Sequence, residues 1–386
     1  MPVPAEHIAA MPRSGIREIM DLAWELGDVV HLEVGEPNFD TPRHICEAAA
    51  AAAMNGATRY TPNAGVAQLR EALAAKVRDR NHVDAEASGI VVGAGAVEAL
   101  YASLATVLSP GNEILLPDPG WPNFRMMADL LRARPVFYRL RPENGFRPDA
   151  DEVRSLVTHR TRALLLNSPS NPLGVVLDSA DLVALLDVAA RYDLWVLSDE
   201  CYDELTFDAP LVSPASLGHE AAVITVYSFS KSYAMTGWRV GYAVVPRVLA
   251  GHLAKVQEPL ISCVNAVAQH AALAAVTGPQ QCVADMLAAY RLRLDAAVAV
   301  AKERSLGYVR PGGAFYLWID VRDAGITSHD LAINLLRHHH VAVAPGTAFG
   351  DEGEGWMRIS LASTEEAIRV GVAALADSVG ALSGRR

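Results

Sequence analysis

Between residues 90 and 245 one pattern recurs: a short apolar run ends in small or polar residues and is followed by helix-like spacing of Leu, Val and Ala. Runs that are apolar at consecutive positions suit strands covered by helices on both faces, as in parallel sheets. The pattern therefore predicts an α/β fold with a large, mostly parallel seven-stranded sheet. The predicted strands are residues 90–92, 113–116, 135–140, 162–166, 194–197, 223–227 and 240–245.

The two ends of the chain depart from this pattern. Residues 14–30 have the spacing of an amphipathic helix, and a long helix with alternating charges is expected after Ala284. Strand-like segments follow at residues 314–319, 341–344 and 357–361. We therefore expect a large α/β domain over residues 45–285 and a smaller α+β domain built from residues 1–44 and 286–386.

Composition excludes two classes of protein. Of the 386 residues, 51% are hydrophobic and 20% are charged, which excludes disorder for most of the length. The formal net charge of −11 argues against a nucleic-acid partner, because phosphate backbones are bound by clusters of Lys and Arg. An anionic ligand must therefore be held locally by a few residues.

Cysteines and apolar segments bear on location. The four cysteines form no C-x-x-C pair, so neither a disulfide framework nor a zinc motif is expected. No signal peptide is evident, and a cytoplasmic location is predicted. No formally charged side chain occurs between Glu258 and Asp285, but frequent polar residues there would be costly in a bilayer. We expect a buried helix in this stretch and no membrane partner.

Polar residues follow three predicted strands, at the sheet edge where α/β proteins bind ligands. Asn171 lies in the loop after one strand, Asp199 directly follows the next, and Lys231 follows a third. A partly desolvated lysine beside other cations has a lowered pKa and can form a Schiff base with an aldehyde cofactor. Asp199 can pair with a pyridinium nitrogen. The segment 92–98 opens a helix whose free N–H groups favour a phosphate.

Other interpretations of single residues carry less weight. The pair Gly93-x-Gly95 suggests a dinucleotide site, but Glu98 stands where the fingerprint needs glycine or alanine. The three histidines at 338–340 lie at a predicted helix end, where they favour the helix dipole, and no metal is expected. Trp121 remains open between a core aromatic and a cofactor contact.

Taken in order, these segments resemble class I/II pyridoxal-phosphate-dependent aminotransferases of fold type I, the aspartate aminotransferase superfamily, over nearly the whole chain. The segments are residues 34–37 (VGEP), 60–65 (YTPNAG), 118–122 (DPGWP), 168–174 (SPSNPLG), 199–202 (DECY), 228–231 (SFSK), 237–242 (GWRVGY), 345–350 (PGTAFG) and 358–360 (RIS). The ordered set is far more specific than any one segment.

The resemblance implies roles for individual residues. Lys231 would hold pyridoxal 5′-phosphate as a Schiff base and move the proton between Cα and C4′, with Asp199 on the pyridine nitrogen. The remaining cofactor contacts would be Tyr202 and Asn171 on the ring O3′, Trp121 on the ring face, and Gly95, Ala96, Val97, Ser228, Ser230, Arg239 and Tyr60 at the phosphate. The substrate carboxylate would be bound by Arg358, helped by the Gly35 backbone and Asn171.

The same resemblance implies partners and a reaction. Tyr60 would reach the phosphate of the neighbouring subunit, which implies a homodimer with shared active sites. The implied activity is an amino acid:2-oxo acid aminotransferase that works by a ping-pong cycle, with glutamate among the donors. β-Elimination or C–S lysis on the same fold is the alternative. A noncatalytic, cofactor-sensing domain of a transcription factor is disfavoured, because no segment before residue 30 has room for its helix-turn-helix module.

This sequence departs from the family pattern in two places. Ser170 and Leu173 replace the Asn and Thr that are common in the loop around Asn171. Some relatives that take acidic substrates have a lysine at the position of Val97, and its absence here argues against a dedicated aspartate enzyme, although another arginine can substitute. The preferred amino acid and 2-oxo acid therefore stay open.

Overall fold

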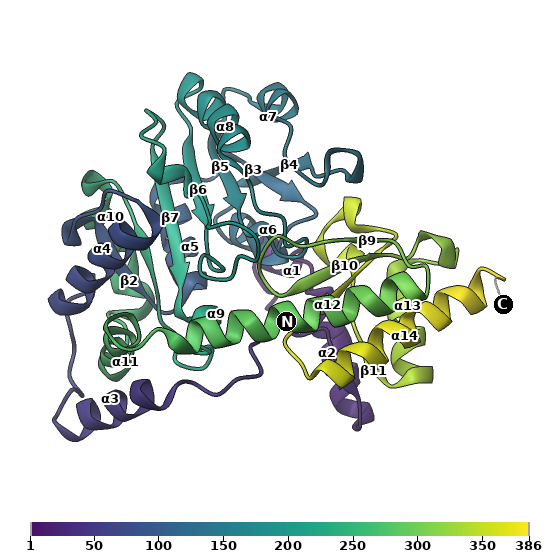
Figure 1. Ribbon diagram of the computed structural model, residues 1–386. Coiled ribbons are helices and arrows are strands. Elements are labelled where there is room, and N and C mark those ends of the chain that lie inside the picture. The colour runs from purple at the N-terminus through teal and green to yellow at the C-terminus, as the bar shows by residue number, and fades with distance from the viewer. Residues whose placement is uncertain (1, 385–386) are drawn as a thin grey trace.

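The computed structural model describes residues 2–384 and is built around a seven-stranded sheet of order β2-β8-β7-β6-β5-β3-β4 (Figure 1). Only β8 runs opposite to the other strands. The strands are β2 (Ile90–Gly93), β3 (Glu113–Asp118), β4 (Arg134–Arg139), β5 (Thr161–Asn167), β6 (Trp195–Asp199), β7 (Val223–Ser228) and β8 (Gly241–Val244). All seven predicted strands and the mostly parallel sheet are confirmed.

Helices cover both faces of this sheet, which explains why the strands are apolar at consecutive positions. Along β3, Ile114 and Leu116 pack into one hydrophobic cluster with Phe124, whereas Leu115 packs into another with Leu185. The helices of this part are α3 (Arg43–Met54), α4 (Ala67–Asn81), α5 (Ala96–Val107), α6 (Pro122–Leu130), α7 (Ala150–Leu156), α8 (Ser179–Arg191), α9 (Phe229–Ser232), α10 (Arg247–Ile261) and α11 (Ala266–Thr277).

The two chain ends build a second, smaller part. A four-stranded antiparallel sheet of order β12-β13-β10-β9 and the parallel pair β1-β11 form its strands. Its elements are α1 (Glu6–Ala9), α2 (Gly15–Leu26), β1 (Val30–His31), α12 (Gln281–Glu303), β9 (Tyr308–Val309), β10 (Tyr316–Asp320), α13 (Ser328–His339), β11 (Val341–Ala342), β12 (Ala344–Pro345), β13 (Trp356–Ser360) and α14 (Glu365–Leu382). Ile19 and Leu32 share one core with Leu317 and Leu375, so both chain ends contribute to it.

This shared core supports the expected division of the chain. We propose a large domain over residues 45–285 and a small domain over residues 1–44 and 286–386. Both boundaries fall inside helices, in α3 and α12. Helix α12 runs from the large part alongside α14 of the small part (Figure 1) and mechanically links the two.

The expectation of one buried helix between Glu258 and Asp285 is wrong. Helix α10 ends at Ile261, where Ser262 takes a positive φ of 58°, and α11 begins after Asn265, whose side chain accepts a hydrogen bond from a backbone N–H of its first turn. Helix α12 then begins at Gln281, earlier than predicted. Small polar residues favour turns and caps over helix interiors, so they divide this uncharged stretch. Within residues 2–384, no helix is both long and apolar enough to cross a bilayer.

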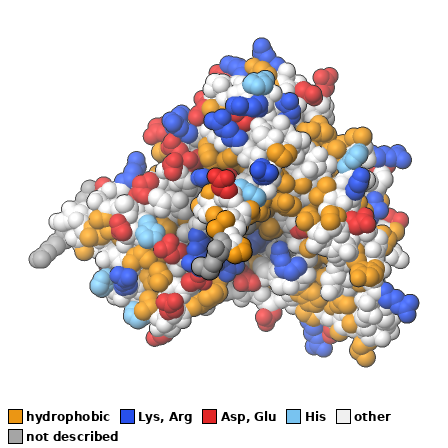
Figure 2. Space-filling view, turned by 180° about the vertical axis from the view of Figure 1, so that it is seen from behind, with side chains coloured by type: hydrophobic (Ala, Val, Ile, Leu, Met, Phe, Trp, Pro, Cys, Tyr) orange, Lys and Arg blue, Asp and Glu red, His pale blue; other side chains and the backbone are white. Residues whose placement is uncertain are grey.

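Surface charge is mixed on the face that Figure 2 shows. Lys and Arg side chains lie scattered there among acidic, apolar and uncharged ones. With a formal net charge of −11, the chain as a whole repels anions. An anionic ligand therefore depends on the positive groups inside its own site.

Candidate active site

A cavity of about 550 Å³ opens at the carboxyl edge of the large sheet, where the small part of the molecule closes over it. Most of the sequence-predicted site residues line it together. These residues are Gly35, Ala96, Val97, Trp121, Asn171, Asp199, Tyr202, Ser228, Ser230, Lys231, Arg239 and Arg358. Residues from five different strand ends or helix starts thus converge, although they are far apart in the sequence.

Lys231 lies in the short helix α9, directly after β7. Its Nζ donates a hydrogen bond of 2.5 Å to the backbone oxygen of Gly35, and burial lowers the pKa of Lys231 to about 8. Of the other lysines in the sequence, Lys255 and Lys302 are exposed, and Lys76 is held in a buried ion pair. Lys231 is therefore the one amine in the described chain that is half-buried, weakly basic and at the cavity wall.

Asp199 ends strand β6 and is almost fully buried. Its Oδ1 accepts a hydrogen bond of 3.1 Å from the backbone N–H of Cys201, which fixes the orientation of the carboxylate. Burial raises the pKa of Asp199, since a charge in this position is poorly solvated. A cationic nitrogen placed against this carboxylate would restore the lost solvation.

Arg358 lies in β13 and is only 2% exposed. Its Nη1 donates a hydrogen bond of 2.9 Å to Asn171 Oδ1, and its Nη2 donates to the backbone oxygen of Glu33. The rings of Tyr316 and Phe349 lie 4.4 and 4.8 Å from its guanidinium carbon. Its Nε is buried without a hydrogen-bond partner in the described chain. The guanidinium is thus fixed in place with donors left over, as bidentate binding of a carboxylate requires.

The start of helix α5 forms the opposite end of the cavity. Gly95 is the N-cap, with a φ of 81°, and a Cβ there would collide with Nη2 of Arg239. Arg239 also donates a hydrogen bond of 2.8 Å to the backbone oxygen of Thr236, and Ser228 Oγ accepts one of 3.1 Å from the N–H of Ser230. Gly95 itself does not line the cavity; it lets Arg239 approach. Helix N–H groups, hydroxyls and a guanidinium are the groups that bind phosphates in proteins.

Tyr316 of β10 is a site residue that the sequence analysis missed. Its hydroxyl lies 2.8 Å from that of Tyr202, and a Cβ at Gly35 would collide with it. In sequence Tyr316 is one aromatic among the apolar residues of a strand, which indicates a core position. Only the tertiary contact with Tyr202 places it at the cavity wall.

Helix α2 was also missed as part of the site. Ile16, Arg17 and Met20 line the cavity from the small part of the molecule. Arg17 contacts Met20 Sδ through Nη1 at 3.8 Å, and within residues 2–384 it pairs with no carboxylate. The amphipathic pattern predicted the helix but gave no sign that one edge of it faces a cavity.

Comparison with known proteins identifies the family of this chain. Residues 27–375 match the family described as aminotransferase class I and II. The chain belongs to this family. It therefore transfers amino groups between amino acids and 2-oxo acids, and the lyase alternative is not favoured.

Relatives of this aminotransferase match most of its length. Aspartate aminotransferase of Pyrococcus abyssi is 39% identical over 92% of both chains. Arginine–pyruvate transaminase of Pseudomonas aeruginosa is also 39% identical, over 89% of this chain and 88% of the relative. The structure of Thermus thermophilus aspartate aminotransferase with maleate superimposes with a TM-score of 0.93, at 35% identity, and covers 98% of this chain and all of that one. Similar identity to relatives named for an acidic and a basic amino acid leaves the substrate side chain open.

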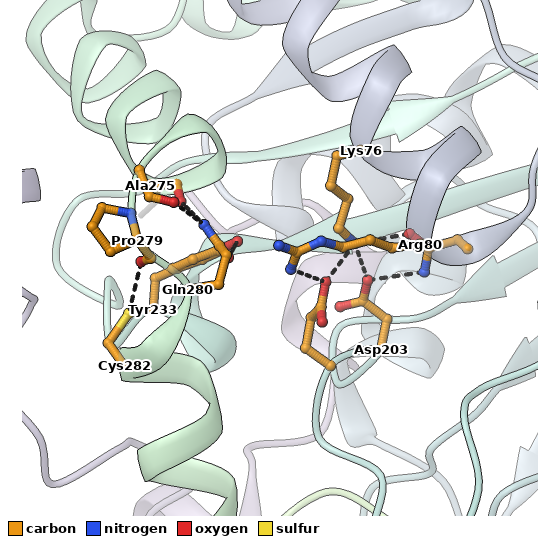
Figure 3. Close-up of polar contacts among 11 residues, drawn as sticks. Lys76, Arg80, Asp203, Tyr233, Ala275, Pro279, Gln280 and Cys282 are labelled. Carbon is orange, nitrogen blue, oxygen red and sulfur yellow. Dashed lines mark hydrogen bonds and ion pairs between the residues drawn. The ribbon is translucent and has the colours of Figure 1, made fainter.

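A buried ion-pair cluster connects helix α4 to the segment that carries Asp199 and Tyr202 in this aminotransferase. Lys76 and Arg80 extend from helix α4 toward Asp203 (Figure 3). The Nζ of Lys76 pairs with Asp203 and lies 3.4 Å from a carboxylate oxygen of Glu204, which Arg80 approaches to 3.1 Å. These ion pairs connect the turn after β6 to helix α4.

Tyr60 is not brought into this cavity. It lies on the loop between α3 and α4, and its side chain is 90% exposed. The described chain thus assembles every sequence-predicted site residue at or beside one cavity except this tyrosine.

Proposed function

We propose that Lys231 binds pyridoxal 5′-phosphate covalently, as a Schiff base, in this aminotransferase. The observation that carries the proposal is the half-buried, weakly basic amine of Lys231, which lines one cavity with Asp199, Ser228, Ser230 and Arg239. When bound, this cofactor supplies an aldehyde for the amino group and a conjugated ring that accepts electrons from the substrate Cα.

The residues present fit this cofactor. The N–H groups of residues 95–97, the hydroxyls of Ser228 and Ser230, and the guanidinium of Arg239 would hold its phosphate. Asp199 would accept a hydrogen bond from the protonated ring nitrogen, which satisfies a carboxylate that burial leaves poorly solvated. Tyr202 and Asn171 would donate hydrogen bonds to the ring oxygen, and Trp121, which lines the cavity at the start of α6, would cover the ring face.

Lys231 also suits the proton transfer. A pKa of about 8 lets the free amine both accept and return a proton near neutral pH, which is the condition for efficient acid–base catalysis. Its hydrogen bond to Gly35 holds Nζ on the side of the cavity that faces the small domain. We propose that, with the cofactor bound, Lys231 would move the proton between the substrate Cα and C4′.

Arg358 would bind the substrate α-carboxylate, and Asn171 and the Gly35 backbone would border the same position.

We further propose that glutamate and 2-oxoglutarate are among the substrates. Once Arg239 and Lys231 are assigned to the cofactor and Arg358 to the α-carboxylate, Arg17 is the remaining cation at the cavity wall among residues 2–384. An anionic side chain is the ligand that such a cation attracts.

The function is tested by separating its two halves. Mixing the cofactor-loaded enzyme with L-glutamate alone is expected to release one equivalent of 2-oxoglutarate per subunit and then stop, because the amino group stays on the enzyme. Adding a different 2-oxo acid is expected to restore the absorption spectrum of the cofactor-loaded enzyme. Continuous release of ammonia from L-cystathionine, which carries the sulfur leaving group that glutamate lacks, without any 2-oxo acid would instead indicate a lyase.

We also propose a homodimer in which Tyr60 of each subunit donates a hydrogen bond to the phosphate bound by the other. The support is that Tyr60 is largely exposed and outside its own cavity, within a segment that resembles the family pattern.

We propose a cytoplasmic location, and the free state of all four cysteines is in keeping with it.

Subunit mixing tests this sharing. Tyr60→Phe alone is expected to weaken cofactor affinity about tenfold through the lost hydrogen bond. A mixed dimer of one Tyr60→Phe subunit and one Lys231→Ala subunit should regain one site with wild-type affinity, since that site combines Lys231 and Tyr60 from different chains. If the mixed dimer shows only the weakened affinity, Tyr60 does not act across the interface.

A further inference from the structure

The end of strand β3 is hydrogen-bonded to a turn of the small domain; we call this contact the clasp. Asp118, the last residue of β3, is 8% exposed, and its two carboxylate oxygens accept hydrogen bonds of 3.2 Å from the backbone N–H groups of Asp351 and Glu352. Two residues later, the N–H of Gly120 donates a hydrogen bond of 2.8 Å to the backbone oxygen of Phe349. Residues 118–120 thus hold the turn 349–352 through three hydrogen bonds.

The turn is shaped for this contact. Gly350 has a φ of 132°, and a Cβ there would overlap the carboxylate of Asp118, so the close approach requires glycine. Arg139 of β4 adds an ion pair of 3.2 Å with Glu352. A buried carboxylate that accepts hydrogen bonds from two backbone N–H groups fixes the position of the turn more specifically than apolar packing does.

The clasped turn leads to the guanidinium of Arg358. Phe349 is buried, its ring centroid lies 4.8 Å from the Cζ atom of Arg358, and the ring packs edge-on against Trp318 at 5.8 Å. Phe349 therefore forms one wall beside the guanidinium, and its own backbone is held by Gly120.

We propose that Asp118 is a positioning residue for substrate binding: by holding the turn 349–352, it keeps Phe349 against Arg358 and so fixes the guanidinium for the substrate carboxylate. This inference rests on the proposed role of Arg358. An arginine held in its binding orientation loses less conformational entropy when the ligand arrives, so its preorganisation lowers KM.

The protonation state of Asp118 supports the same role. Burial, together with the neighbouring carboxylates of Asp351 and Glu352, raises the pKa of Asp118 to about 6, although the two backbone N–H bonds act in the opposite direction. Above this pH the ionised group accepts both N–H bonds, and below it a protonated oxygen is a poorer acceptor, so the clasp weakens as pH falls. The other charged or titratable groups near this contact are Arg139, paired with Glu352, and Arg13, Arg125 and His329, which line the adjoining cavity.

Asp118→Ala, Phe349→Leu and the double variant test the proposal in the holoenzyme. Each single change is expected to raise KM about fivefold for both L-glutamate and L-alanine, with kcat changed less than twofold. The KM of the double variant should be no higher than that of the worse single variant, because both changes break the same chain of contacts. Asp118→Asn should remove the rise of KM that the wild type shows below pH 6. Asp351→Asn, an exposed carboxylate in the same turn, is the matched control and should leave KM unchanged.

Three results would overturn the inference: an unchanged KM in Asp118→Ala and Asp118→Asn, additive effects in the double variant, or a pH dependence of KM that survives in Asp118→Asn. The asparagine variant serves if the alanine variant does not fold. Wild-type turnover in the same assay reports separately on the proposed function, so its failure is distinguishable from a failure of the role of Asp118.

Discussion

Lys231→Ala is expected to lower kcat by about 10³-fold or more, because the substitution removes both the covalent attachment and the acid–base group. The variant should still bind the cofactor through Asp199 and the groups that would hold its phosphate, but without the visible absorbance of the lysine-bound form. The measurement is the absorption spectrum of the purified variant, together with its turnover of L-glutamate and 2-oxo acid.

A matched control exists for this change. Lys302→Ala removes an exposed lysine from the last turn of α12 and is expected to leave turnover and spectrum unchanged. A phosphopyridoxyl group that borohydride fixes covalently to the Lys231→Ala chain would show that the cofactor is attached elsewhere.

Arg358→Leu is expected to raise KM by about 10²-fold, the effect of losing a pair of charge-assisted hydrogen bonds. The factor should be similar for every amino acid substrate, because all share the α-carboxylate. Arg358→Lys keeps the charge but not the forked geometry, and an intermediate KM is expected. A loss confined to one substrate side chain would refute the role of Arg358 in binding the α-carboxylate.

Arg17→Met provides the opposite pattern for comparison. It should reduce kcat/KM about tenfold for L-glutamate and leave L-alanine within a factor of two, since only the glutamate side chain would reach Arg17. Arg13→Met is the control, because Arg13 is already paired with Asp21 at 2.8 Å. Equal losses for both substrates would show that Arg17 acts on something other than the substrate side chain.

Much of the fold follows from local pattern. The strands of the large sheet are apolar on both faces because helices cover both, so each one is visible as an uninterrupted run such as residues 194–197. The reversed direction of β8 is not visible, because strand direction depends on how the chain returns after Lys231 and not on the composition of the strand. The break at Ser262 was missed because helix-forming segments lie on both sides of it.

The site was predictable where it lies at strand ends. Asp199 and Lys231 directly follow buried strands, so sequence alone brings them to one edge. Tyr316 and Arg17 could not be found this way, because a strand interior and a helix face become part of a cavity only through domain packing. Asp118 lies within a segment that the resemblance used, but its contact with the turn 349–352 spans more than two hundred residues and has no local signature.

The most direct test of the central claim is to locate the cofactor on the chain. Reduction of the wild-type holoenzyme with sodium borohydride, followed by peptide mapping, should find the phosphopyridoxyl group on Lys231, with the other three lysines unmodified. Modification of Lys76, Lys255 or Lys302 in place of Lys231, or no modification at all, would contradict the account.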